Sequence, residues 1–320
     1  MSKLRNAVAG VLLAGAVTVT FAQADTYPDK AVQVVVPWAA GGSVDTMARA
    51  LTTAMGKAMG QSFVVANRDG AAGMVGTGAV ANAQPDGYML TFGPITPITN
   101  AAQLLKKPAF TADSFEYVCQ VFENRFGIAV PQASPYKTMQ ELLDAMKAEP
   151  NKISYGHIGN GSISHLSFET AVQGKNLQYT GVPYRGEIPI FVDMMANRLD
   201  VGIVTIGGAL MGSRPVRFLA VIGEVRHPGA PDVPTLKELG MPTLLPALNG
   251  LMAPKGTPQP VLRKLESACR QATASDEMKQ ATTALREQII YLPGAQFAER
   301  TRRDYAEKGA LIKRLNLVQD

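Results

Sequence analysis

Short apolar stretches rich in Val, Ile and Tyr recur along the chain, and segments with helical spacing separate many of them. An alternation of short strands with helices is typical of βαβ units and of largely parallel sheets. The pattern predicts strands at 32–36, 63–66, 88–92, 116–121, 127–130, 153–156, 180–182, 201–206 and 217–222. From Val261 onward it predicts helices, the last of them over 306–317.

The clearest predicted helix begins near Ser43. Apolar residues recur there at steps of three and four, which places them on one buried face. These residues are Val44, Met47, Ala48, Leu51, Met55, Ala58 and Met59. A second helix, over 138–148, starts at Thr138 with Glu141 three residues later, the spacing of a capping box. A further helix starts near Ser162.

Length and composition indicate a globular chain with two lobes. The 320 residues are 46% hydrophobic and 18% charged, so the chain can bury a substantial core. Two proline-rich passages, 227–235 and 253–260, are interpreted as surface connections between elements.

The N-terminus has the pattern of a signal peptide. Lys3 and Arg5 precede an apolar run over 7–21, which ends in the small-x-small sequence Ala22-Gln23-Ala24. The run is short for a bilayer span and is interrupted by glycines, so we favour a cleaved leader over a membrane anchor. We predict that residues 1–24 are removed by cleavage after Ala24 and that the remaining chain is exported to the periplasm.

Charge and cysteine content narrow the functional classes. Removing Lys3 and Arg5 from 31 basic side chains leaves 29 against 26 acidic ones, a formal charge of +3. That charge is too weak and too scattered for a nucleic-acid-binding surface. The two cysteines, Cys119 and Cys269, are compatible with a disulfide in an oxidising compartment and equally with two buried free thiols.

Two glycine-containing loops are the main candidates for ligand binding. Pro37-Trp-Ala-Ala-Gly-Gly-Ser43 follows the first predicted strand, and Gly159-Asn-Gly-Ser-Ile-Ser-His165 follows the strand at 153–156. Ligands of parallel α/β sheets bind beyond the carboxyl ends of strands, and backbone N–H groups at a glycine turn before a helix suit a carboxylate. Either loop alone is also compatible with an ordinary connection. Two such loops favour a cleft that they face from opposite sides.

Five motifs in collinear order carry a family resemblance. They are YPDKAVQVVVPWAAGGSVDTMARAL, VANRDGAAGMVGTGAVANAQPDGYML, ISYGHIGNGSISHL, VPYRGEIPIFVDMMANRLD and PDVPTLKELG. Over about residues 27–260 the chain resembles the periplasmic solute-binding proteins of tripartite tricarboxylate transporters, often called Bug proteins. The resemblance implies an α/β fold with two lobes, the type II periplasmic binding protein or Venus flytrap. Each lobe is then a mixed, mainly parallel sheet flanked by helices.

The resemblance also implies lobe boundaries and partners. Residues 25–125 and 246–320 would form the first lobe and residues 126–245 the second, with crossings near 123–127 and 245–250. The implied function is that of a monomeric receptor. It would bind a small aromatic or aliphatic mono-, di- or tricarboxylate between its lobes and deliver it to a membrane permease.

The expected ligand-binding residues come from the two loops and from positions near the cleft. They are Trp38, Ala39, Ala40, Gly41, Gly42, Ser43, Asp45, Thr96, Gly159, Asn160, Gly161, Ser162, His165, Tyr184, Arg185 and Thr205. Ser162 also fits a helix N-cap, His165 a loop-bracing role and Arg185 a solvated position. We expect Asp45 to anchor its loop or hold a water molecule, because direct contact with an anionic ligand would be repulsive.

Two departures from the family pattern bear on the ligand. Trp38 stands where the family commonly has Phe or Tyr, so it either stacks on an aromatic ligand or only packs between the lobes. Many members also carry an acidic residue shortly after the strand that is 201–206 here, and Val204-Thr205 has none. An amino acid is therefore a weaker expectation than a simple or aromatic carboxylate.

Two enzyme hypotheses are less well supported. A periplasmic hydrolase could use Ser162 and His165, but the chain has three histidines and neither a G-x-S-x-G nor an H-E-x-x-H motif. A nicotinamide enzyme could be inferred from Gly76-Thr-Gly-Ala-Val-Ala81, which does not directly follow a strand. We therefore expect a binding protein and not an enzyme, with no cofactor and no metal site.

Overall fold

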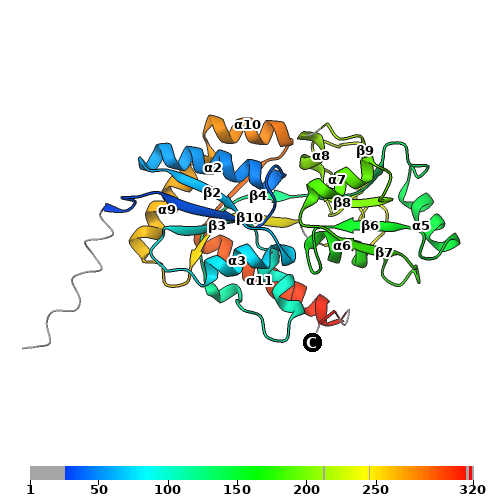
Figure 1. The fold of residues 1–320 in the computed structure, drawn as a ribbon, viewed down its shortest axis with the longest axis horizontal. Coiled ribbons are helices and arrows are strands. Elements are labelled where there is room, and N and C mark those ends of the chain that lie inside the picture. The colour runs from blue at the N-terminus through cyan, green and yellow to red at the C-terminus, as the bar shows by residue number, and fades with distance from the viewer. Residues whose placement is uncertain (1–25, 212, 245, 315–316, 319–320) are drawn as a thin grey trace, which may run out of the picture.

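The computed structural model describes residues 26–211, 213–244, 246–314 and 317–318. The predicted signal peptide and its cleavage site after Ala24 lie outside these residues. Figure 1 shows two α/β halves side by side, each built on its own sheet with flanking helices. This is the two-lobed α/β architecture that the sequence predicts.

The first half contains a six-stranded sheet with the order β11-β4-β10-β3-β1-β2. Its strands are β1 (Val32–Val36), β2 (Phe63–Asn67), β3 (Met89–Pro94), β4 (Phe115–Asn124), β10 (Ala247–Pro254) and β11 (Ile289–Pro293). Its α-helices are α2 (Ser43–Met59), α3 (Met74–Ala81), α4 (Thr96–Thr99), α9 (Gln259–Thr273), α10 (Asp276–Leu285) and α11 (Gly294–Arg314). Three short 3-10 helices belong here as well: η1 (Ala71–Gly73), η2 (Ala101–Leu104) and η3 (Ala112–Ser114).

The second half contains a five-stranded sheet with the order β7-β6-β8-β5-β9. Its strands are β5 (Phe126–Pro131), β6 (Ser154–His157), β7 (Thr180–Pro183), β8 (Val201–Thr205) and β9 (Val216–Val221). Its helices are α5 (Met139–Ala148), α6 (Ile163–Val172), α7 (Glu187–Met195) and α8 (Ile206–Met211).

The chain passes between the two sheets twice, from β4 to β5 and from β9 to β10. The strands at these crossings pair antiparallel with their neighbours, β10 with β3 and β4, and β5 with β8 and β9. Parallel pairing joins β1 to β2 and β3, and β6 to β7 and β8. Both sheets are mixed and mainly parallel in strand direction, as expected. β10 and β11 run against the other strands of the first sheet, and β5 runs against those of the second. β5 and β10 each enter their sheet from the other half, and each runs antiparallel to its neighbours in that sheet.

Two strands lie where the sequence pattern does not predict them. β10 has the sequence ALNGLMAP, which contains no β-branched residue, and β11 interrupts the C-terminal region that was expected to be helical. Both strands pair with β4. For β10 this long-range pairing outweighs weak local propensity, whereas the Ile-Ile-Tyr sequence of β11 itself favours a strand that the sequence interpretation did not predict. Ala253 and Pro254, expected in a surface connection, are instead buried in β10. The passage 227–235 is also packed at its ends, because His227 and Thr235 are fully buried.

The helical predictions hold for the strongly patterned segments. Met47, Leu51 and Met55 of α2 are fully buried, although Ala58 is exposed. The capping box of α5 is present, with the backbone N–H of Glu141 donating to Thr138 Oγ1 at 3.1 Å. α11 begins earlier than predicted, and its helical bounds end at Arg314.

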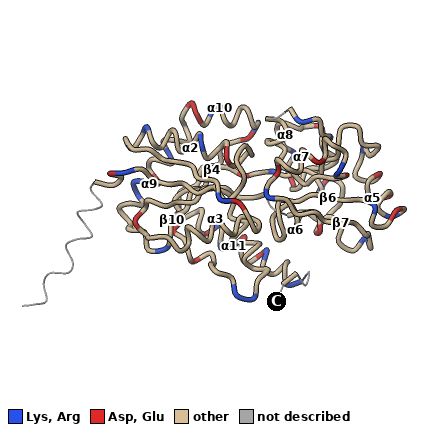
Figure 2. The backbone as a smooth tube through the Cα atoms, viewed as in Figure 1, with Lys and Arg blue, Asp and Glu red and all other residues tan. Residues whose placement is uncertain are grey.

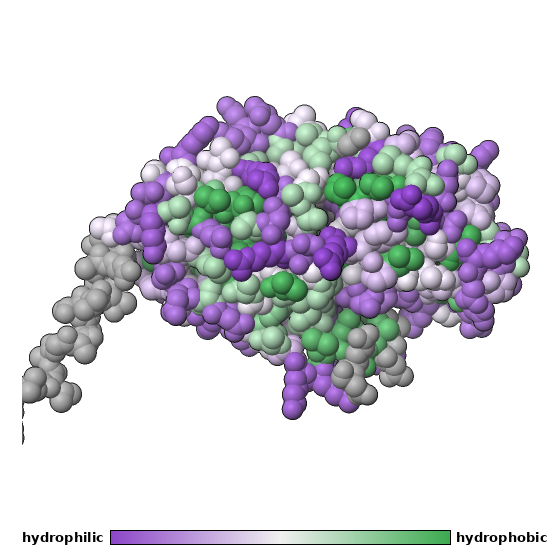
Figure 3. Space-filling model, in the orientation of Figure 1, coloured by the Kyte–Doolittle hydropathy of each residue, from purple (hydrophilic) through white to green (hydrophobic). Residues whose placement is uncertain are grey.

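Basic and acidic residues are both distributed along the chain in both halves (Figure 2). Hydrophobic residues on the face in Figure 3 form small separate patches. Within the described ranges, no helix is long and apolar enough to cross a membrane. The same residues contain no group of three or more His, Cys, Asp or Glu side chains that could hold a metal ion.

Candidate functional site

Two adjoining pockets lie where the halves meet. The inner pocket has a cavity volume of about 40 Å³. It is lined by Trp38, Ala39, Gly42, Ser43, Val44, Asp45, Pro94, Thr96, Asn124, Phe126, Ile158, Ile163, Gly186, Glu187, Ile188, Thr205 and Ala247. The outer pocket, of about 450 Å³, is lined by Trp38, Gly70, Ala71, Ala72, Met74, Ala101, Leu104, Leu105, Ile158, Gly159, Asn160, Pro183, Tyr184 and Arg185. Trp38 and Ile158 line both pockets and therefore separate them.

The first glycine loop leads from β1 into α2 and is held by Asp45. Asp45 accepts hydrogen bonds from the backbone N–H of Gly41 at 2.9 Å, from Asn67 Nδ2 at 2.9 Å and from Arg49 Nε at 3.0 Å. Burial alone would raise the pKa of Asp45, but the hydrogen bonds from Arg49, Gly41 and Asn67 outweigh it and hold the pKa below its usual value. Asn67 also donates to the Trp38 carbonyl at 3.0 Å. Asp45 thus anchors the loop, which is one of the two roles expected for it.

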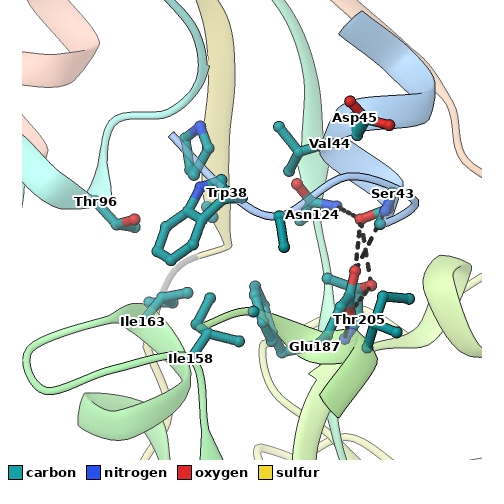
Figure 4. Close-up of a pocket in the computed structure, with 17 residues that line it drawn as sticks. Trp38, Ser43, Val44, Asp45, Thr96, Asn124, Ile158, Ile163, Glu187 and Thr205 are labelled. Carbon is teal, nitrogen blue, oxygen red and sulfur yellow. Dashed lines mark hydrogen bonds between the residues drawn. The ribbon is translucent and has the colours of Figure 1, made fainter. Parts of the chain in front are cut away.

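Trp38 and Thr96 form one side of the inner pocket (Figure 4). The Trp38 side chain is 7% exposed, and its ring lies against Gly73, where an added Cβ would be 3.1 Å from Trp38 Cζ2. Trp38 Nε1 and Thr96 Oγ1 are buried and have no hydrogen-bond partner among the residues that the structure describes. Two polar groups on this side of the pocket are therefore buried without a hydrogen-bond partner within the described part of the chain.

The opposite side of the inner pocket is a hydrogen-bonded cluster centred on Glu187 (Figure 4). Glu187 Oε2 accepts from the backbone N–H of Thr205 at 3.0 Å and from Thr205 Oγ1 at 2.5 Å. Its Oε1 accepts from the backbone N–H and from Oγ of Ser43, both at 3.3 Å. Asn124 Nδ2 donates to Ser43 Oγ at 3.1 Å. Because Ser43 starts α2 and Thr205 ends β8, this carboxylate links the two halves.

Glu187 is a second carboxylate in the inner pocket, beside the expected Asp45, and the sequence interpretation did not predict it. The carboxylate does not follow the strand at 201–206 but reaches Thr205 from the first residue of α7. The sequence gives only a weak indication that Glu187 belongs to the site. An acidic residue directly after VPYRG is equally explained by the favourable helix dipole at the start of a helix. The ammonium group of an amino-acid ligand would therefore find a carboxylate in this pocket, so an amino acid is no longer the weaker expectation.

The second glycine loop leads from β6 into α6. Ser162 is the N-cap of α6, as expected, and its Oγ accepts from the backbone N–H of His165 at 3.3 Å. The backbone N–H of Gly161 donates to His165 Nδ1 at 3.0 Å, and the His165 ring stacks on His157 with a centroid separation of 4.6 Å. His165 therefore braces the loop. Because His165 Nδ1 already accepts the Gly161 N–H, this nitrogen does not act as a base toward Ser162, and the two side chains do not form a nucleophile–base pair.

The predicted ligand-binding residues divide into three groups. Those on the inner pocket are Trp38, Ala39, Gly42, Ser43, Asp45, Thr96 and Thr205. Those on the outer pocket are Gly159, Asn160, Tyr184 and Arg185, together with Trp38. Ala40, Gly41, Gly161, Ser162 and His165 line neither pocket. The sequence interpretation missed three lining residues in or next to the glycine loops, Val44, Ile158 and Ile163. It also missed Pro94, Asn124, Phe126, Gly186, Glu187, Ile188 and Ala247, which come from segments that approach the loops only in the fold.

The buried His157 gives the second loop a predicted pH dependence. Burial and the neighbouring His165 lower the pKa of His157 from 6.5 to about 4, against an opposing backbone hydrogen bond with Gly159. The unfolded chain binds a proton at this position near pH 6.5, so folding stability should fall as the pH drops from about 6.5 to about 4. At pH 5 the loss should be about 2 kcal/mol relative to neutral pH.

Urea unfolding at pH 5 and pH 7 tests this expectation. His157→Phe keeps an aromatic ring against Tyr155 and His165 but cannot be protonated, so its stability should depend less on pH than that of the wild type. Equal pH dependence in both proteins would show that His157 does not carry the effect.

Comparisons with known proteins agree on one family. Residues 47–317 match the family described as TctC, the tripartite tricarboxylate transporter family receptor. A curated relative from Cupriavidus necator, the "UPF0065 protein in gbd 5'region", is 29% identical over 299 residues, covering 93% of this chain and 91% of the relative.

Solved structures agree with that match. The periplasmic binding protein BugD is 29% identical with a TM-score of 0.86, covering 92% of this chain and 100% of BugD. MatC from Rhodopseudomonas palustris with bound malate is 28% identical with a TM-score of 0.81, at the same coverage. The family and these neighbours are solute-binding proteins and not enzymes. The chain therefore belongs to the tripartite tricarboxylate transporter receptor family.

Proposed function

We propose that this chain is an extracytoplasmic receptor that binds a small carboxylate between its two halves and delivers it to a tripartite tricarboxylate transporter permease. The observation that carries the proposal is the inner pocket, whose lining comes from both halves and is mostly apolar with a few hydrogen-bonding groups. Such pockets are typical of small-molecule sites. The malate bound by MatC, a relative of the same family, supports a carboxylate as the ligand class.

The proposal includes location and lobe organisation. The receptor acts as a monomer in the periplasm after loss of residues 1–24. Residues 25–125 and 246–320 form one lobe, and residues 126–245 form the other. The strand memberships support this division, because the first sheet ends at Asn124 and resumes at Ala247.

The proposed mechanism is a shift in a closure equilibrium. The inner pocket has room for a few water molecules in the closed arrangement, so a larger ligand enters when the lobes separate. Ligand that touches both lobes binds the closed form better and shifts the population toward it. The closed form then presents a surface that the permease recognises.

A thermal-shift screen of the chain against aliphatic and aromatic carboxylates, amino acids and nicotinamide cofactors tests the ligand class. A ligand at about a hundred times its Kd adds about 2.7 kcal/mol to native stability, which raises the unfolding midpoint. Trp38 is the only tryptophan in the sequence, so its fluorescence reports binding at the pocket independently. A shift from a cofactor alone, or from no carboxylate, would contradict the proposal.

Trp38→Ala separates the two roles open to this side chain. If the ring stacks on an aromatic ligand, the variant should lose about 2- to 10-fold more affinity for an aromatic carboxylate than for an aliphatic one. Isothermal titration calorimetry with benzoate and hexanoate measures both losses, and Trp38→Phe serves as a control that retains a ring. Equal losses for both ligands would assign Trp38 to lobe packing.

A further inference from the structure

We infer that Glu187 occupies hydrogen-bond donors that a ligand carboxylate would otherwise use. Glu187 thereby restricts the inner pocket to ligands with a single carboxylate. This inference rests on the proposed function and deepens it by naming the ligand class.

Glu187 takes the donors that a bound carboxylate would use at this side of the pocket. Two of its four hydrogen bonds come from Ser43 at the start of α2, and two come from Thr205 at the end of β8. The side chain is closely confined, because a Cβ added at Gly42 or at Gly208 would be 3.2 Å or 2.9 Å from Glu187 Oε1. A ligand carboxylate can reach these donors only by displacing Glu187.

The charge of Glu187 has no cationic partner among the described residues that line the inner pocket. Asp45 and Glu187 are the charged members of that lining, and Arg49 already pairs with Asp45. A second ligand carboxylate placed beside Glu187 would be repelled by its like charge. It would also find the donors of Ser43 and Thr205 already bonded to Glu187. This repulsion disfavours dicarboxylates as a class and does not favour any particular monocarboxylate.

The free donors lie on the other side of the pocket. Trp38 Nε1 and Thr96 Oγ1 are both buried without a partner among the described residues, and Figure 4 places Trp38 and Thr96 across the pocket from the Glu187 cluster. Apolar side chains, including Val44, Ile158 and Ile163, also line this pocket. A ligand with one carboxylate at the Trp38 side and an apolar body matches this distribution.

Matched ligand pairs test the inference by calorimetry on the full exported chain. Hexanoate and adipate, and benzoate and terephthalate, differ by one carboxylate on the same carbon frame. The wild type should bind the monocarboxylate of a pair at least about tenfold more tightly, and Glu187→Gln should reduce that preference at least about tenfold by strengthening dicarboxylate binding. Glu224→Gln removes an exposed carboxylate from the same half and should leave the preference unchanged.

Each result decides the question. An unchanged preference in Glu187→Gln, with carboxylates still bound, would overturn the inference and leave the proposed function intact. A loss of affinity in this variant for an amino acid such as aspartate would also overturn it, because Glu187 would then pair with a ligand ammonium. Binding of no carboxylate by either protein would remove the proposed function together with the inference.

Discussion

Replacing Gly161 with leucine should weaken ligand binding about 10- to 100-fold, because it should hold the two halves apart. A Cβ at Gly161 would be 2.2 Å from Leu104 Cδ1 and 3.1 Å from Ala101 Cα, both in the other half. Leu104 can rotate, but the backbone at Ala101 cannot yield as easily. The substitution therefore opposes closure while each half keeps its own core.

Gly174→Leu is a matched control for this variant. Gly161 and Gly174 have φ values of +73° and +75°, so leucine meets the same left-handed backbone at both positions. Nothing lies within 4 Å of the Cβ position at Gly174. Small-angle scattering with saturating ligand should show an open form for Gly161→Leu and a closed form for Gly174→Leu. A closed Gly161→Leu with wild-type affinity would contradict the closure mechanism.

Loss of the disulfide between Cys119 and Cys269 should lower the free energy of unfolding by about 2 to 4 kcal/mol. The bond joins β4 to α9 within the first half and closes a loop with a sequence separation of 150, so it removes many conformations from the unfolded chain. Both cysteines are fully buried. The double variant Cys119→Ala and Cys269→Ala should unfold at lower urea concentration than the oxidised wild type.

Reduction provides the internal control for the disulfide. Dithiothreitol should lower the urea midpoint of the wild type toward that of the double alanine variant and should not affect the variant itself. Ligand affinity should change little, because neither cysteine lines the inner or the outer pocket. An oxidised wild type that is no more stable than its reduced form would show that the cross-link does not contribute.

Local sequence patterns determined the elements whose stabilising groups lie within a few residues. The apolar face of α2, the Thr138 capping box and the Ser162 N-cap depend on spacings of three or four residues, and the structure has all of them. The two glycine loops are also visible in the sequence, because positive φ angles such as those at Gly41, Gly159 and Gly161 favour glycine. The collinear motifs were enough to indicate the family.

Tertiary structure alone decided the features that join distant segments. β10 has weak strand propensity of its own and exists because β3 and β4 pair with it, and the cysteines are bonded because β4 and α9 pack together. Glu187 reaches the site because α7 starts beside Ser43, a residue 144 positions earlier in the chain. A single sequence records spacing along the chain but not which distant segments meet, so the contacts of Glu187 with Ser43 and Thr205 became visible only in the fold.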